Sequence, residues 1–250
     1  MKHLIIGAGI VGKATGIWLE TNKHDVTYFD TDEHQLSRWA ESGRKVCFDF
    51  KPEDYDVCWI CTPETAVELI LKYLPRDTFV VVRSSTIPGT LQMLQDKYNI
   101  KNLVHNPEFL REKTAWEDMF NPERIVIGGE SFAAGCIERI YSSCTCPKFV
   151  VSLTESELIK QIANSYLATQ ISFWNEIKTI CDNFGVNSQE VANIVALDKR
   201  VSKYGTMMIG KPFQGKCLPK DLNNLLKVMQ ERGIESIVLD AIKKSNEKRK

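Results

Sequence analysis

The chain has 250 residues, of which 43% are hydrophobic, and its 32 Lys and Arg residues balance its 32 Asp and Glu residues. This length can bury one large core or two modest ones, and the balanced charge gives no net field that would attract nucleic acid or a charged membrane. No apolar run has transmembrane length. We therefore expect a globular protein that binds neither nucleic acid nor membranes.

The cysteines indicate a reducing environment. The N-terminal sequence MKHLIIGAGIVG passes from a short apolar run directly into glycines, without the longer apolar region and cleavage site of a signal peptide. Eight irregularly spaced cysteines then predict reduced thiols in a cytoplasmic protein. Cys58 and Cys61 have a redox spacing, but their apolar, strand-like context predicts buried side chains. Cys144 and Cys146 lack the further ligands of a zinc site, so we predict no metal.

Residues 1–152 alternate short β-branched runs with amphipathic stretches, as expected for parallel strands joined by crossover helices. The predicted strands are HLIIG, DVTYFD, DVCWIC, TFVVVRSS, NLVHN, RIVIGG and KFVVS. The predicted helices lie near 11–22, 32–42, 64–74, 89–97 and 131–141, with Pro63 and Pro88 where helices should begin. The fold class is therefore α/β, with a Rossmann-like doubly wound parallel sheet.

Residues 153–250 are predicted to form a second, all-helical domain. The stretch TESELIKQIANSYLATQISFWNEIKTICDNFG predicts one long helix stopped by Gly185. Its apolar residues at helical spacing include Leu158, Ile162, Tyr166, Ile171 and Phe173. A short helix near 188–197, a glycine- and proline-containing loop at 202–219, and helices near 220–232 and 235–248 follow. The final NEKRK is predicted to be a fraying polar end.

GAGIVG, residues 7–12, has G-x-G-x-x-G spacing directly between an apolar strand and a helix. Gly7 permits the tight turn, Gly9 lets the backbone approach a pyrophosphate, and Gly12 lets helix and strand pack closely. Asp30 ends the second predicted strand, where an acidic side chain accepts hydrogen bonds from the ribose hydroxyls of NAD and repels the additional phosphate of NADP. The sequence therefore predicts NAD as the cofactor.

Further polar candidates lie in two segments. The long predicted helix carries Lys160 and Asn164, four residues apart and therefore on one face, and the segment NPEFLRE carries Glu108 and Glu112. A solvated helix face or loop would also explain each of these side chains taken alone. These residues can therefore be assigned to a site only if other motifs in the sequence indicate the same site.

Cys217, in the segment GKCLPKD, adjoins Lys216 and lies near Lys220. Positive charge beside a thiol favours the thiolate, which is the form that acts as a nucleophile. The alternative is a small buried hydrophobic residue, which is the commoner role of cysteine in globular proteins.

Four segments carry a resemblance to a known family: SSTIPGT (84–90), NPEFLREKTAWEDMFNPERIVIGG (106–129), ESELIKQIANSYLATQISFWNEI (155–177) and CLPKD (217–221). In this order behind the nucleotide motif, they resemble the UDP-glucose and GDP-mannose dehydrogenase family. The resemblance implies an NAD domain and a helical dimerisation region, hence a homodimer through the long helix. It also implies a third domain for the substrate's nucleotide, which we expect to be absent here; a separate chain could supply that site.

The resemblance further implies four-electron oxidation of a nucleotide sugar, with UDP-glucose as first candidate. An alcohol becomes an aldehyde, Cys217 adds to it as a thiohemiacetal, a second hydride loss gives a thioester, and water releases the carboxylate. Lys160 and Asn164 would donate to developing oxygen charge. The implied positions near the hydrolytic water are Asp221, Glu112 and Thr86, and those on the substrate side are Glu108, Lys160 and Asn164. The expected cofactor contacts are Gly7, Gly9, Ile10, Val11, Gly12, Asp30, Thr62, Thr86 and Glu112.

One departure from the family and two alternatives bear on this interpretation. Ahead of the cysteine the family has a run resembling G-x-G-F-G-G-x-C, whereas this chain reads GKPFQGKC, with Pro212 and Gln214 in place of two glycines. Proline removes a backbone donor, so main-chain contacts to the sugar are expected to differ. A dehydrogenase of small hydroxyacids would give Cys217 no role. An NAD-binding interaction subunit without turnover would need no catalytic side chains at all.

Overall fold

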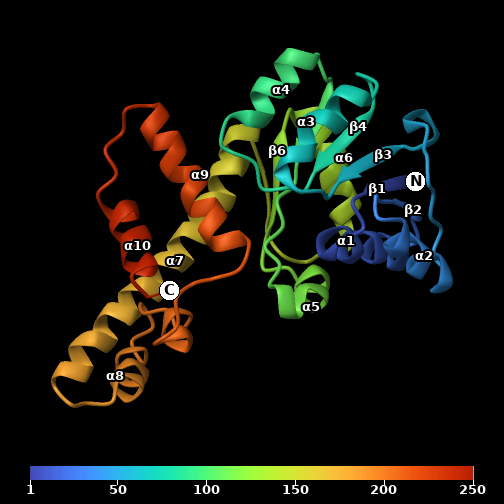
Figure 1. Cartoon of the computed structure of the whole chain (residues 1–250). Coiled ribbons are helices and arrows are strands. Elements are labelled where there is room, and N and C mark those ends of the chain that lie inside the picture. Colours follow the sequence, from blue (N-terminus) through green and yellow to red (C-terminus); the bar gives the residue numbers. More distant parts are fainter. Residues whose placement is uncertain (250) are drawn as a thin grey trace. The chain divides into compact units, whose positions relative to one another are not determined.

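The computed structural model describes residues 1–249, apart from the side chain of Glu112. The chain forms two compact units, unit 1 (Met1–Lys160) and unit 2 (Gln161–Lys250) (Figure 1). The longest helix, α7 (Leu153–Asn183), contributes its N-terminal part, through Lys160, to unit 1. The domain boundary predicted from the sequence, between residues 152 and 153, falls at the start of α7, eight residues ahead of the division between the two units.

Unit 1 is built on a seven-stranded sheet with the strand order β2-β1-β3-β4-β5-β6-β7. The strands are β1 (Lys2–Ile6), β2 (Asp25–Phe29), β3 (Val57–Ile60), β4 (Phe79–Val82), β5 (Asn102–His105), β6 (Ile125–Gly129) and β7 (Lys148–Val151). Neighbouring strands pair in parallel, except that β5 and β6 are antiparallel. The predicted doubly wound sheet is therefore confirmed, with one antiparallel pair that the strand sequences did not indicate.

Two apolar cores fill the two faces of this sheet. Side chains alternate along each strand, so Trp59 and Val81 lie in the core with α1 (Ile10–Thr21), α2 (Glu33–Glu41) and α6 (Ser131–Ile140). Cys58 and Val80 lie in the other core, with α3 (Glu64–Tyr73) and α4 (Thr90–Tyr98). Because both faces are covered, β3 and β4 are continuous apolar runs.

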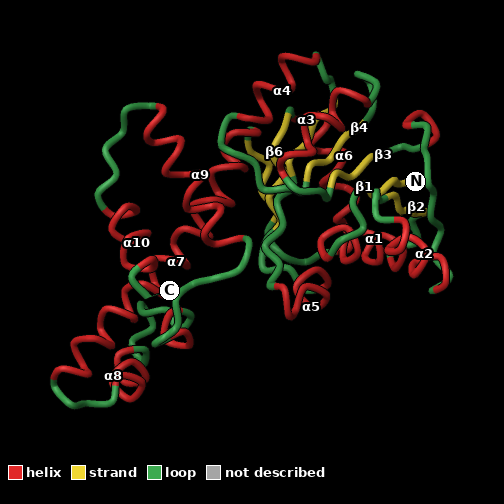
Figure 2. The backbone as a smooth tube through the Cα atoms, in the orientation of Figure 1, coloured by secondary structure: helices red, strands yellow, loops and turns green. Residues whose placement is uncertain are grey.

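The helices of unit 1 agree with prediction to within about one residue at each end, the usual uncertainty of helix bounds. Figure 2 shows them around the yellow strands. The sequence did not predict α5 (Ala115–Phe120), which has no side-chain cap and is only two turns long or less. Short 3-10 turns lie at Pro52–Asp54, Glu112–Thr114 and Tyr141–Ser143.

Unit 2 is built from the rest of α7, α8 (Ser188–Val195), α9 (Cys217–Glu231) and α10 (Val238–Glu247), with a 3-10 turn at Gly205–Met208. The predicted long helix is confirmed, and it ends ahead of Gly185, which has a left-handed φ of +65°. The predicted loop extended too far, because α9 begins at Cys217 and not near residue 220. Pro219 lies in the first turn of α9, where its missing N–H has no helical partner to lose.

The expectation of a fraying C-terminal end is wrong for Asn246. This side chain is buried, and its amide accepts from the Phe213 N–H (2.8 Å) and donates to the Phe213 carbonyl (3.0 Å). Arg249 Nη2 also donates to the Asn175 carbonyl of α7 (2.5 Å). The sequence shows that the residues of this end are polar, but it does not show that Asn246 pairs with the loop at Phe213.

Candidate functional site

The glycine turn joins β1 to α1 at the carboxyl end of β1. Gly7 has a left-handed φ of +97°, and a Cβ at Gly12 would lie 1.9 Å from the Gly7 carbonyl oxygen, so neither position accepts a side chain. A Cβ at Gly9 would meet no atom within 4 Å. The backbone at the N-terminus of α1 therefore faces open space, where helical N–H groups and the helix dipole suit a pyrophosphate.

Asp30 follows β2 directly and is held beside this turn. Its carboxylate accepts from the N–H groups of Ala8 (2.6 Å) and Asp32 (3.0 Å) and from the Gln35 side chain (3.0 Å). These donors fix the carboxylate where the ribose of a dinucleotide lies in such folds. Asp30 also stabilises the turn itself, a second role that the sequence did not indicate.

Thr62 follows β3, on the other side of the glycine turn. Its methyl group lies 3.0 Å from the Cβ position of Gly7, and its carbonyl accepts from the Ser84 hydroxyl (2.6 Å). The buried Thr62 Oγ1 has no hydrogen-bond partner in the described part of the chain. An orphaned hydroxyl beside the turn fits a bound polar group. Ile10 and Val11 belong to the first turn of α1.

Lys160 and Glu108 are in contact within unit 1. Lys160, on α7, is only 4% exposed; its Nζ donates to the Glu108 carbonyl (2.6 Å) and lies 3.2 Å from Glu108 Oε1. The ammonium also lies 5.3 Å from the ring centroid of Phe109. Glu108 in turn accepts from the Leu110 N–H (2.6 Å). Lys160 is therefore a fixed cation and not a solvated one.

The loop that carries Glu108 begins in a buried polar network that the sequence did not reveal. Arg83 donates to Asn106 Oδ1 and to the Tyr141 hydroxyl (3.2 Å), and this hydroxyl donates to Asn106 Oδ1 (2.6 Å). Asn106 Nδ2 donates to the Val126 carbonyl (2.7 Å). Burial raises the pKa of Tyr141 to about 12, so its hydroxyl remains a donor. The network fixes the start of the loop.

Thr86 is almost fully buried, and its hydroxyl donates to Glu157 Oε1 (2.8 Å). Glu157 lies on α7 within unit 1, and sequence reasoning missed it because a glutamate in a helix is usually solvated. Its position inside the segment ESELIK was the one available signal. The side chain of Glu112 lies outside the described residues, so its predicted role stays a prediction.

In unit 2, Asn164 of α7 and Asp221 of α9 are in contact. Asn164 Nδ2 donates to Asp221 Oδ2 (2.5 Å), and Lys220 Nζ lies 3.3 Å from Asp221 Oδ1. Asp221 is fully buried, whereas Cys217, one turn earlier on α9, is exposed. Cys217 is the first residue of α9, where the helix dipole favours negative charge. The exposed thiol therefore has the surroundings of a nucleophile and not of core filling.

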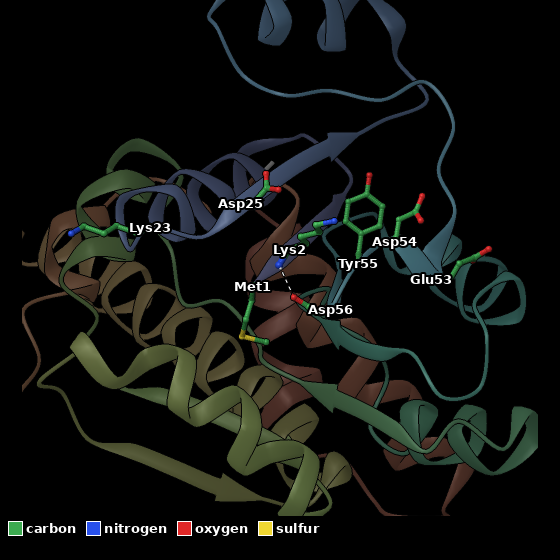
Figure 3. A pocket seen from close by; sticks show the side chains of 8 residues that line it. All are labelled: Met1, Lys2, Lys23, Asp25, Glu53, Asp54, Tyr55 and Asp56. Carbon is green, nitrogen blue, oxygen red and sulfur yellow. Dashed lines mark hydrogen bonds between the residues drawn. The ribbon is translucent and has the colours of Figure 1, made fainter.

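The hollow drawn in Figure 3 lies elsewhere in unit 1, where β1 and β2 begin and just ahead of β3. It is lined by Met1, Lys2, Lys23, Asp25, Glu53, Asp54, Tyr55 and Asp56. The Lys2 N–H donates to Asp56 Oδ2 there (2.7 Å). None of the predicted site residues lines it, because those of unit 1 follow the carboxyl ends of strands or lie on α7.

The described residues hold no cluster of three or more His, Cys, Asp or Glu side chains that could bind a metal ion. They also include no helix with both the length and the apolarity needed to cross a bilayer. Burial raises the pKa of the Cys58 and Cys61 thiols to about 12, so both stay protonated, which argues against redox chemistry at this pair.

The sheet, the glycine turn and Asp30 together define a dinucleotide-binding protein of the dehydrogenase type. Residues 52–145 match the NAD binding domain of the UDP-glucose/GDP-mannose dehydrogenase family, and residues 154–248 match its central domain. The chain belongs to this family, as its motifs predicted, and NAD is its cofactor.

Individual relatives agree with this assignment. A UDP-glucose 6-dehydrogenase of Rickettsia conorii is 30% identical over an alignment of 292 positions, which covers 100% of this chain and 67% of that protein. A UDP-glucose dehydrogenase structure from Pyrobaculum islandicum has 29% identity and a TM-score of 0.85, covering 98% of this chain and 68% of that one. A 3-hydroxyisobutyrate dehydrogenase of Mycobacterium tuberculosis has a TM-score of 0.81 at 15% identity, covering 96% and 90% of the two chains, and shares the fold alone.

Proposed function

We propose that the protein is an NAD-dependent dehydrogenase that oxidises a nucleotide sugar by four electrons, with UDP-glucose as the first candidate substrate. The observation that carries this proposal is the exposed Cys217 at the N-terminus of α9, one turn from a buried Asp221 that Asn164 holds. A dehydrogenase of small hydroxyacids would leave this cysteine without a role. A binding subunit without turnover would need neither the thiol nor its surroundings.

In the proposed reaction the primary alcohol loses a hydride and a proton and becomes an aldehyde. The Cys217 sulfur then bonds to the aldehyde carbon, and the resulting thiohemiacetal loses a second hydride and a proton to become a thioester. Water breaks the C–S bond and releases the carboxylate and the thiol. Bound NAD supplies the hydride acceptor in both oxidations, so each product accounts for two NADH.

Lys160 suits the stabilisation of oxygen charge in these steps, because its ammonium is buried and already fixed by Glu108. A fixed donor needs little reorganisation when charge develops on the substrate oxygen. Asn164 and Asp221 form the corresponding pair in unit 2 and are proposed to orient the hydrolytic water. Thr86 and Glu112 stay in the proposal as further positions for that water.

We also propose that residues 153–250 form a dimerisation domain in a cytoplasmic homodimer. The apolar side chains of α7 that remain exposed in unit 2 are Ile162, Tyr166, Phe173 and Ile180, followed by Phe184. Their spacings of four and seven residues place them along one helix face. A second copy would cover this face, since exposed apolar patches of this kind usually mark interfaces.

The experiment is to mix the protein with NAD and a panel of UDP- and GDP-sugars and to quantify both NADH and carboxylate. We expect two NADH per carboxylate for the best substrate. Cys217→Ser should reduce carboxylate formation by about 10³-fold or more, and Lys160→Ala by about 10²-fold or more. Cys136→Ser, a partly exposed cysteine of α6, is the matched control and should retain the wild-type rate.

Two outcomes would overturn the proposal. If Cys217→Ser forms carboxylate at the wild-type rate, no thioester intermediate is involved, and the hydroxyacid dehydrogenase becomes the better interpretation. If the wild-type protein turns over no sugar nucleotide, even with cell lysate added to supply a partner chain, the NAD-binding subunit becomes the better interpretation.

A further inference from the structure

Glu157 is a fully buried carboxylate of α7 with no part in the reaction proposed above. Its oxygens accept three hydrogen bonds, from the Thr86 hydroxyl (2.8 Å), the Gly89 N–H (2.7 Å) and the Leu91 N–H (3.0 Å). Within the described residues, no Lys or Arg forms an ion pair with it. The carboxylate is therefore satisfied by three donors from one short segment, residues 86–91.

This segment is a tight turn that leads into α4. Residues 87–90 form a type II turn, with Pro88 second, Gly89 third at φ +93° and ψ −10°, and the Thr90 N–H bonded to the Ile87 carbonyl (2.9 Å). Gly89 is also the N-cap of α4, and it offers no side chain to cap the helix. Glu157 thus caps α4 from another helix, where the dipole of α4 favours its negative charge.

A second carboxylate holds the same turn, because Glu64 of α3 accepts from the Ile87 N–H (3.1 Å). Glu64 is also the charged group that acts on Glu157, and its negative charge raises the pKa of Glu157. Lys160, about one turn along α7, is engaged with Glu108. His105 on β5 pairs with the neighbouring Ser156, and burial lowers the pKa of His105 to about 3, so this ring is neutral. Neither group therefore supplies a cation that keeps Glu157 charged.

We propose that Glu157 is a positioning residue: its carboxylate holds the turn that carries Thr86, and uptake of a proton by this carboxylate releases the turn. The inference rests on the proposed function in one respect only, namely that Thr86 takes part in the reaction. Charge on Glu157, and not merely its size, is what the turn requires.

The hydrogen-bond inventory explains why a proton matters. The carboxylate is an acceptor for three donors, whereas the protonated acid brings a donor of its own into the same space. The Thr86 hydroxyl can rotate and accept a hydrogen bond from the protonated acid. The N–H groups of Gly89 and Leu91 can only donate, so they cannot pair with this new donor. Protonation therefore turns the Thr86 hydroxyl round or leaves a buried N–H without an acceptor. Burial raises the pKa of Glu157 to about 7 against the opposing effect of its donors, which places this change near neutral pH.

The first test needs no substrate and no NAD. Exchange protection of the Gly89 and Leu91 amides, corrected for intrinsic exchange, should rise about tenfold or more as the pH is raised through about 7. In Glu157→Gln, which cannot become an anion, protection should stay low at every pH. Glu155→Gln is the matched control on the same helix, because glutamine keeps the acceptor that bonds the Ser152 N–H (2.8 Å). It should follow the wild-type profile.

Two further variants keep the test decisive. Glu64→Gln removes the negative charge that faces Glu157 but keeps an acceptor for Ile87, so the midpoint of the protection profile should move to lower pH. This variant decides the matter if Glu157→Gln does not fold. Glu157→Asp should restore part of the pH dependence, because it restores the charge. Wild-type protection in Glu157→Gln, or an unshifted midpoint in Glu64→Gln, would overturn the proposal.

The second test is kinetic and applies if a sugar nucleotide is turned over. In Glu157→Gln we expect kcat to fall about tenfold and to lose its rise with pH, while NAD affinity stays within about twofold. An unchanged pH profile of kcat would overturn the link to catalysis. If no substrate is found, the proposed function fails, but the exchange profiles still accept or reject the role of Glu157 in holding the turn.

Discussion

Two buried amides, Asn175 and Asn246, hold the loop ahead of Cys217, and removing the second should destabilise unit 2. Asn246 of α10 bonds both the N–H and the carbonyl of Phe213 (2.8 and 3.0 Å), and both residues are buried. Asn246→Ala would leave the N–H and the carbonyl of Phe213 without this partner inside a buried site. Each buried group left unsatisfied costs about 1–3 kcal/mol, so the expected loss for the two groups is about 2–6 kcal/mol.

Urea denaturation of the wild type and the variant, followed by circular dichroism, measures this loss as a shift of the midpoint at constant slope. Asn183→Ala is the matched control: this asparagine is exposed and donates one hydrogen bond to the Thr179 carbonyl within α7 (2.9 Å). The control should change stability by no more than about 0.5 kcal/mol. If Asn246→Ala is as stable as this control, Asn246 does not hold the loop.

Three further predictions follow from other contacts. Wild-type protein should bind NAD at least about tenfold more tightly than NADP, or about 1.4 kcal/mol, because Asp30 lies where the additional phosphate would bind; equal affinities by calorimetry would contradict this. Light scattering at micromolar concentration should show a dimer, and Phe173→Glu should dissociate it without unfolding the chain, since Phe173 is 54% exposed; a monomeric wild type would refute the interface. Burial raises the pKa of Glu157 from 4.5 to about 7, so the folded chain keeps a proton that the unfolded chain releases in this window. The free energy of unfolding should therefore fall by up to about 3 kcal/mol as pH rises from about 4.5 to 7, and Glu157→Gln should abolish that part of the slope. This sign is opposite to that of the exchange profile of the turn, because unfolding exposes Glu157 to water, whereas local opening of the turn removes its donors and leaves it buried.

Local patterns were sufficient for most of the fold. β3 and β4 are continuous apolar runs because both faces of the sheet are covered, and such runs flanked by helical periodicity identify a parallel sheet. The sequence also indicated where two helices begin: Pro63 is the N-cap of α3, and Pro88 directly precedes Gly89, the N-cap of α4. The antiparallel pairing of β5 and β6 was not predictable, since neither strand's composition encodes the direction of its neighbour.

The functional residues likewise fall into two groups, those that a local motif indicated and those that only the fold brings together. The glycine turn and Asp30 belong to a short motif whose spacing has a direct physical meaning, so the sequence indicated them. Glu157 and Asn246 were missed because glutamate and asparagine side chains in helices are usually exposed to solvent. Each is buried by a loop far away in sequence, the 86–91 turn and the segment at Phe213. Such long-range pairings leave no periodic signal in the sequence.

This chain departs from the family's glycine-rich run at Pro212 and Gln214, and the backbone conformation there accepts both side chains. Gly210 and Gly215 have left-handed φ values of +82° and +83°, and both remain glycine. Pro212 and Gln214 occupy positions without a positive φ, so side chains there strain nothing. The loop can thus keep its course to Cys217, while Pro212 removes one main-chain N–H and Gln214, which is exposed, adds a side-chain amide. If the chain oxidises a sugar as proposed, the substitutions alter the donors offered to this substrate and not the backbone course to the thiol, so they should change which sugar is bound more than the chemistry.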